Sequence, residues 1–305
     1  AIEVIDLEKS FGDIDAVDGI SFAVQPGETF GFLGPNGAGK TTTIRMLTGV
    51  LKPDTGSAHV AGADVQRDRK HARSAVGIVP EQFNGFADLT AWQNLQFAGE
   101  LYGLSKKQRN QRATTLLEDF ELADRRDALA KAYSKGMKQR LMLAMALIHD
   151  PAILILDEPI TGLDVESQRL MRERIAALNE DGRTVLITTH NIEEADRLCD
   201  RVAIITGGTI RAIDRPEVLK RNYDASRAID VSFDGAVPEE DLATLPAVKS
   251  LRRRGDTMRL HTGDPSATIT GIAELSSQQG TAIRTLQTCE PSLEDVFTTV
   301  TGGCR

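Results

Sequence analysis

The first 80 residues of this chain carry the hydrophobic pattern of β-strands. Apolar and polar residues alternate over 1–25, and the short apolar runs that follow are bounded by glycine and proline residues. Between 89 and 149 the apolar residues recur at helical spacing instead, which predicts three amphipathic helices. We therefore expect a strand-rich N-terminal region and an inserted helical subdomain at about 85–150.

Strands and helices alternate again after the helical block. The sequence predicts buried strands at 153–156 and 184–189, each followed by a helix, and then a hairpin over Gly207-Gly208. Buried strands that alternate with helices form largely parallel sheets covered on both faces, and the hairpin makes the sheet mixed. The expected fold class is α/β, in a domain that covers 1–221.

The alternation restarts near residue 222. The predicted order is strand, helix, strand, strand, helix, strand, and a final helix begins near Ser292, with Asp295 three residues on. This βαββαβ order is the split-βαβ, or ferredoxin-like, arrangement. We expect a small α+β domain over 222–305.

Composition limits the class of protein. The formal net charge is -8 and 41% of the residues are hydrophobic, which disfavours a general nucleic-acid binder and suits a soluble globular protein. The longest apolar run, 141–148, is shorter than the ~20 residues of a spanning helix, and the first residues do not resemble a signal peptide. Three scattered cysteines, Cys199, Cys289 and Cys304, are expected to be reduced thiols. These features predict a cytosolic protein.

A glycine-rich stretch between a predicted strand (28–33) and a predicted helix (42–47) matches the pattern G-x-x-x-x-G-K-[ST] at every fixed position. Glycines let several backbone N–H groups point at one anion. Lys40 can then reach the outer phosphates of a nucleotide, and the Thr41 hydroxyl can ligate Mg²⁺. The residues expected to bind nucleotide here are Gly34, Pro35, Asn36, Gly37, Ala38, Gly39, Lys40, Thr41 and Thr42.

Two carboxylates follow the buried strand at 153–156. Asp157, at the end of the strand, can hold Mg²⁺ in the way that Walker-B aspartates do. Glu158, one residue later, is placed to polarise the attacking water as a general base. The sequence thus predicts a site for nucleotide hydrolysis.

At this point the chain resembles the ATP-binding subunits of ABC transporters, over about 1–220. Phe11 matches the aromatic residue that stacks on adenine, and Gln82 matches the Q-loop glutamine. The segment 133–137 falls where the family has its signature motif, Asp164 lies in the D-loop, and His190 matches the switch histidine. The resemblance implies that Gln82 and His190 act with Glu158 in catalysis.

The signature motif departs from the family pattern at two positions. Lys135 replaces the first glycine of a pair, and Met137 replaces a glutamine. The Ser134 hydroxyl and the Gly136 backbone N–H remain, at the start of a predicted helix. We expect Ser134, Gly136 and Asp164 to contact the nucleotide of a second subunit in a working but variant site.

Further expectations come from the same resemblance. The tail from 291 to 297 is similar to the ending of a small domain appended to ATPases of ABC-2-type exporters, including drug and sodium exporters. The family assignment implies an ATP-hydrolysing subunit that uses ATP and Mg²⁺, with Thr41, Gln82 and Asp157 arranging the ion. It implies a homodimer that sandwiches ATP and a separate integral membrane permease, contacted through 81–89 at the inner face of the cell membrane. No nucleic-acid partner is expected.

Two alternatives remain. Soluble ABC ATPases that act on ribosomes or DNA usually carry two cassettes or long coiled-coil insertions, and this chain has one cassette and neither insertion. A binding module that no longer hydrolyses ATP is disfavoured by the intact Glu158.

Overall fold

The computed structural model describes residues 1–222, 227–289 and 292–301. The chain divides into two compact units, Ala1–Pro216 and Glu217–Arg305. The boundary expected from the sequence, after residue 221, lies five residues further along the chain. Cys304, and residues 290–291 before the last helix, lie outside the described residues.

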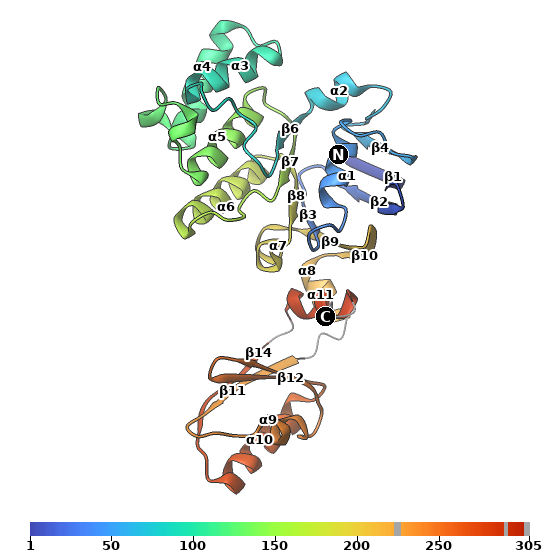
Figure 1. The fold of residues 1–305 in the computed structure, drawn as a ribbon, viewed down its shortest axis with the longest axis vertical. Helices are drawn as coiled ribbons and strands as arrows, with labels where there is room; N and C mark the ends of the chain where they lie inside the picture. Colours follow the sequence, from blue (N-terminus) through green and yellow to red (C-terminus); the bar gives the residue numbers. More distant parts are fainter. Residues whose placement is uncertain (223–226, 290–291, 302–305) are drawn as a thin grey trace. The chain divides into compact units, whose positions relative to one another are not determined.

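A six-stranded sheet forms the centre of the first unit (Figure 1). In spatial order its strands are β10 (Thr209–Asp214), β9 (Arg201–Thr206), β3 (Thr29–Leu33), β8 (Thr184–Thr189), β7 (Ile153–Asp157) and β6 (Val76–Val79). All are parallel to their neighbours except β10, which returns antiparallel beside β9. Because β3, β8 and β7 are parallel neighbours, the residues that follow them meet at one edge of the sheet.

The burial pattern of β7 explains why its apolar run is continuous. Ile153 and Ile155 pack in the core that includes helix α1 (Lys40–Leu47), whereas Leu154 and Leu156 belong to a second core on the opposite face. Helix α6 (Val165–Glu180) lies on that opposite face (Figure 1). A strand that is covered on both faces needs apolar residues at every position.

A second, antiparallel sheet packs against α1 in the same core. Its order is β2 (Ile14–Val24), β1 (Ile2–Phe11), β4 (Thr55–Val60) and β5 (Ala63–Asp64). The Phe22 ring of β2 stacks on Phe30 of the central sheet, with centroids 5.5 Å apart. This packing brings the end of β1, with Phe11, next to the loop that follows β3.

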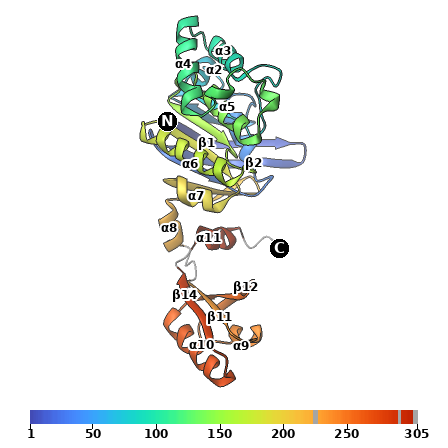
Figure 2. The same ribbon diagram turned by 90° about the vertical axis from the view of Figure 1, so that its left-hand side faces the viewer.

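The predicted helical subdomain is confirmed. It contains α3 (Ala91–Leu101), α4 (Lys106–Asp119), α5 (Lys135–Leu147) and the short 3₁₀ turns η1 (Ala123–Arg125) and η2 (Ala130–Ala132) (Figure 2). Thr90 and Ser105 begin α3 and α4 with capping boxes, which satisfy helix N–H groups that have no partner inside the helix. Two short helices, α2 (Arg69–Ser74) and α7 (Ile192–Leu198), complete the unit.

The second unit has the predicted βαββαβ order. Its sheet runs β12 (Val248–Arg254), β13 (Thr257–Thr262), β11 (Arg227–Phe233) and β14 (Ile283–Cys289), with all neighbours antiparallel. Helices α9 (Glu239–Ala243) and α10 (Pro265–Gln279) contribute Leu242 and Ile272 to the core of this sheet. The ferredoxin-like fold is therefore confirmed. Helix α8 (Pro216–Asn222) precedes the sheet, and Ser292 begins α11 (Leu293–Val300) with the expected capping box.

Candidate active site

The P-loop joins β3 to α1, and two of its glycines are required by close backbone contacts. A Cβ on Gly34 or Gly39 would lie 2.4 Å from the carbonyl oxygens of Ile205 and Ala16, respectively. Gly39 also has a φ of 106°, which only glycine adopts without strain. Since α1 begins at Lys40, the unpaired N–H groups of its first turn face the loop.

The Lys40 ammonium is buried among oxygen atoms. Its Nζ donates to the carbonyl oxygens of Gly34, at 2.6 Å, and Pro35, at 3.2 Å. It also lies 3.4 Å from Glu158 Oε1, and the two side chains are only 6% and 7% exposed. A buried ammonium needs such partners because the desolvation of a charge is costly.

Asp157 occupies the end of β7, between two hydroxyl groups. Its Oδ2 accepts a hydrogen bond from Thr41 Oγ1 at 3.2 Å, and its Oδ1 accepts another from Thr188 at the end of β8. Hydroxyl and carboxylate oxygens are ligands that Mg²⁺ prefers. Thr41 and Asp157, both expected from the sequence to arrange Mg²⁺, therefore lie side by side.

The two oxygens of Glu158 have different surroundings. Oε2 accepts from Thr161 Oγ1 at 2.8 Å and lies 2.9 Å from His190 Nδ1. Because an ionised carboxylate can only accept, Nδ1 is the protonated ring nitrogen in this pair. Oε1 faces Lys40 and has no hydrogen-bond partner in the described chain. One oxygen is thus held by two neighbouring side chains, while the other faces only the Lys40 ammonium.

The backbone of Glu158 is strained. Its φ of 51° lies in the left-handed region, which costs a residue with a side chain about 1–3 kcal/mol. The conformation is held because the Glu158 N–H donates to the carbonyl oxygen of Thr188 at 3.0 Å. In this conformation the carboxylate contacts both Lys40 and His190.

Lys40, Thr41 and Glu158 line a cavity of about 540 Å³, a size typical of small-molecule sites, and Asp157 lies behind this lining. Phe11, half exposed at the end of β1, lies at one wall, and Thr161 and His190 lie at another. The complete lining is Phe11, Ala16, Pro35, Asn36, Gly37, Ala38, Gly39, Lys40, Thr41, Thr42, Glu81, Glu158, Thr161 and His190. The P-loop, the candidate base, the candidate switch histidine and the candidate adenine-stacking residue therefore meet around one space.

Gln82 is not part of this lining. It borders a neighbouring cavity of about 280 Å³, and the preceding residue, Glu81, borders both cavities. Its expected roles in catalysis and Mg²⁺ binding stay predictions.

Ser134, Gly136 and Asp164 also lie outside the 540 Å³ cavity. Ser134 and Asp164 cap α5 and α6, where their side chains accept from the N–H groups of Met137 and Ser167. A Cβ on Gly136 would lie 2.3 Å from Ser167 Oγ, so glycine is required by packing within this chain. The expected contact of these residues with nucleotide remains a prediction.

Two threonines in the site were not identified from the sequence. Thr188 pairs with Asp157 across the β7–β8 ladder and donates to its carboxylate, and Thr161 donates to Glu158. The sequence does contain a feature that marks Thr188. A polar pair, Thr188-Thr189, ends an otherwise apolar strand directly before His190.

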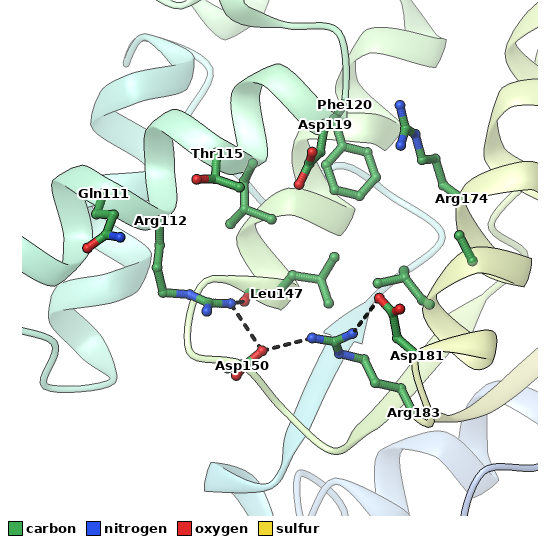
Figure 3. Close-up of a pocket in the computed structure, with 13 residues that line it drawn as sticks. Gln111, Arg112, Thr115, Asp119, Phe120, Leu147, Asp150, Arg174, Asp181 and Arg183 are labelled. Carbon is green, nitrogen blue, oxygen red and sulfur yellow. Dashed lines mark hydrogen bonds and ion pairs between the residues drawn. The ribbon is translucent and has the colours of Figure 1, made fainter.

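Another cavity, of about 440 Å³, lies between α4, the end of α5 and α6 (Figure 3). Arg112 and Arg183 converge on Asp150 Oδ1 at 3.3 and 2.8 Å, and Arg183 also contacts Asp181 at 3.5 Å. The hydrogen bond from Arg183 holds the pKa of Asp150 below its usual value. These arginines are paired with carboxylates, and none of the site residues expected from the sequence lines this cavity.

Comparison with known proteins identifies the family. A family model described as ABC transporter matches residues 17–161, and one described as the C-terminal domain of ATP-binding protein DrrA1-3-like matches 215–301. Nod factor export ATP-binding protein I of Burkholderia lata is 40% identical over 99% of this chain and 97% of that protein. This chain belongs to the ATP-binding subunits of ABC transporters. The protein of the same name from Rhizobium sp. (strain N33) is 39% identical to this ABC subunit, over 99% of the chain and 97% of the relative.

Solved structures support the same assignment for the cassette. An ATP-binding subunit of an ABC transporter superposes with a TM-score of 0.67 and 31% identity, over 73% of this chain and 92% of that one. The dimeric cassette MJ0796, bound to ADP and Pi in a post-hydrolysis state, superposes with a TM-score of 0.65 and 25% identity. The match covers 70% of this chain and 98% of that one. This ABC subunit is therefore an ATPase of the exporter class. None of the helices in its described residues has the length and hydropathy of a membrane span.

Proposed function

We propose that this ABC ATPase hydrolyses ATP with Glu158 as the general base, in a site completed by a second copy of the chain. The observation that carries the proposal is the asymmetric environment of the Glu158 carboxylate. Thr161 and His190 hold Oε2, whereas Oε1 lies 3.4 Å from Lys40 Nζ and has no hydrogen-bond partner in the described chain. A base that is fixed through one oxygen can take a proton from water through the other.

The remaining chain groups position the phosphates. The P-loop N–H groups and the Lys40 ammonium bind the phosphate oxygens, and Lys40 exchanges its carbonyl and Glu158 contacts for them. Thr41 and Asp157 supply two oxygen ligands for Mg²⁺, and their 3.2 Å hydrogen bond shows that both side chains already face one point. When bound, Mg²⁺ neutralises charge on the phosphates. His190 holds Glu158 and reaches the same cavity, where it senses the terminal phosphate.

The proposed second half of the site comes from the other subunit. Ser134 and Lys135 are exposed and do not line the nucleotide cavity of their own chain, and the related MJ0796 cassette was solved as a dimer. Arginine at position 134 blocks the helix N-terminus and is expected to weaken ATP-driven dimerisation while leaving ATP binding by the monomer intact.

The test mixes Ser134→Arg subunits with Lys40→Ala subunits, each inactive alone. In the mixed dimer one site is built from two intact halves and the other carries both substitutions. Nucleotide trapping at one site per dimer is the expected result. Loss of ATP binding by the Ser134→Arg monomer would show that the motif acts within its own chain.

We further propose that the segment 81–89 contacts a separate membrane permease at the inner face of the membrane. Phe86 and Phe97 are 49% and 40% exposed, and their rings meet edge to face with centroids 4.9 Å apart. The buried Asn94 side chain binds both the N–H and the carbonyl oxygen of Phe86, which holds this aromatic pair in a fixed position. A rigid exposed aromatic pair suits a partner groove.

Substitution of either phenylalanine should reduce recovery of an integral membrane partner in co-purification. Phe86→Ser and Phe97→Ser are compared with Leu101→Ser, which removes a more exposed apolar side chain from the same subdomain. Equal loss of partner in all three variants would assign the effect to general hydrophobicity. Recovery of ribosomes or DNA alone would favour a soluble ABC ATPase.

A further inference from the structure

The 280 Å³ cavity beside the nucleotide cavity has the properties of an anion site. It lies between the segment 81–83, the first turns of α5 and Thr161. Its lining consists of Glu81, Gln82, Phe83, Lys135, Lys138, Gln139, Met142 and Thr161. The volume admits a small oxyanion with several waters, since liquid water takes about 30 Å³ per molecule.

Gln139 supplies the first indication of a ligand. Its side chain is 4% exposed, and its Nε2 has no hydrogen-bond partner in the described chain. A buried amide without a partner is unfavourable, and native proteins rarely retain one. Gln139 is one of the residues that line this cavity, and a ligand whose acceptor oxygen reaches the amide would satisfy it.

The charges in the lining favour an anion. Lys135 and Lys138 both border the cavity, and no salt bridge of either residue is found in the described part of the chain. Lys135 Nζ lies over Gly162, 2.4 Å from where a Cβ would stand, and Lys138 Nζ lies 6.0 Å from the centroid of the Phe83 ring. The one acidic residue, Glu81, is on the side shared with the nucleotide cavity.

The position of the cavity indicates which anion. Glu81 and Thr161 border both cavities, and Thr161 binds Glu158, the proposed base. Hydrolysis of ATP therefore generates phosphate next to this second space. We propose that the 280 Å³ cavity is a binding site for inorganic phosphate, which receives the product after it leaves the nucleotide cavity. The inference rests on the proposed position of hydrolysis, although binding itself can be measured without turnover.

The test measures binding of inorganic phosphate while the P-loop is filled. The full-length protein is saturated with Mg²⁺ and the β,γ-imido analogue of ATP, which occupies the triphosphate positions. Phosphate is then titrated at constant ionic strength, by equilibrium dialysis with labelled phosphate and by thermal unfolding. Wild type should bind one phosphate per chain and should show a rise in Tm.

Two variants address the lining. Gln139→Leu and Lys135→Gln should each weaken phosphate binding about tenfold or more, the loss expected for one hydrogen bond to a charged group. Lys106→Gln, which removes the same charge at the exposed start of α4, is the matched control and should bind phosphate like wild type. Gln139→Leu should also unfold at an equal or higher temperature without phosphate, because it removes an amide that has no partner.

Three results would overturn the proposal. The first is a single phosphate site that the imido analogue fully displaces, because that site is the P-loop. The second is unchanged phosphate affinity in both lining variants. The third is acetate binding as tightly as phosphate, which would assign the cavity to a carboxylate. Failure of Lys40→Ala to lose binding of the imido analogue would instead contradict the proposed nucleotide site, so the two failures are distinguishable.

Discussion

Replacement of Glu158 by glutamine isolates the charge of the proposed base. Glutamine keeps an acceptor for Thr161 and His190 but removes the carboxylate oxygen that has no hydrogen-bond partner, 3.4 Å from Lys40 Nζ. A positioned general base contributes about 10²–10⁴-fold, which is about 3–5 kcal/mol of activation free energy. We therefore expect kcat to fall by that factor.

Binding and folding should respond differently from turnover. Removal of one partner of a buried ion pair lowers the free energy of unfolding by up to about 3–5 kcal/mol. The cost here should be smaller, because Lys40 keeps the carbonyl oxygens of Gly34 and Pro35. Lys40 also loses its competing anion, so Mg²⁺-ATP should bind as tightly as in wild type or more tightly.

The assay separates these quantities. Phosphate release in a single turnover gives the chemical step, a fluorescent ATP analogue gives affinity, and urea unfolding gives stability. Glu180→Gln, at the exposed end of α6, is the control for loss of one glutamate. Near-normal phosphate release by Glu158→Gln would refute the assignment of the base.

Three further outcomes follow from individual contacts. Thr188→Val removes the hydroxyl that binds Asp157 and should raise the Mg²⁺ concentration needed for half-maximal ATPase activity about 10–100-fold, measured by Mg²⁺ titration. Gly162→Ala should destabilise the protein in urea unfolding, because φ is +70°, whereas Lys135 Nζ lies at the end of a flexible side chain that can move away from the new Cβ. Burial raises the pKa of Glu194, so the folded state binds more protons and stability falls as pH rises above about 4.3, the unfolded value. Glu194→Gln should therefore gain stability in urea unfolding at about pH 7 and lose that gain at about pH 4.

The sequence predicts most of this fold because its strongest signals are local. The apolar run at 153–156 marks a strand buried on both faces, and the βαββαβ order of the second unit follows from short periodic segments. Element ends were less accurate. The start of helix α6 at Val165 carries no clear sequence signal, because Val165 is 82% exposed and marks no apolar face. Strand β1 continues to Phe11 beyond a register shift near Asp6, which has a φ of 45° and interrupts the alternation.

Tertiary contacts explain what the sequence did not reveal about the site. Thr188 was missed because its partner, Asp157, is a neighbour only across the β7–β8 ladder. Asp164 shows a different difficulty: an aspartate before a helix is a capping residue whatever else it binds, and here it caps α6 through Ser167. The contacts within one chain therefore explain Asp164 as a helix cap, and a contact with a second subunit leaves no separate mark on its sequence position.

The segment from 157 to 164 connects Glu158, the proposed base, to the first turn of helix α5 within one chain. Glu158 is bound to Thr161, the next residue, Gly162, lies under Lys135 of α5, and Asp164 begins α6. Two contacts, Glu158 with Thr161 and Gly162 with Lys135, therefore connect the hydrogen bonding of Glu158 to the first turn of α5. The phosphate site proposed beside Lys135 and Gln139 lies on the same path, so product in that cavity would act on the helix that is predicted to close the partner's nucleotide site. Hydrolysis in one site and release of the other subunit would then share one set of contacts, with no long-range transmission through the sheet.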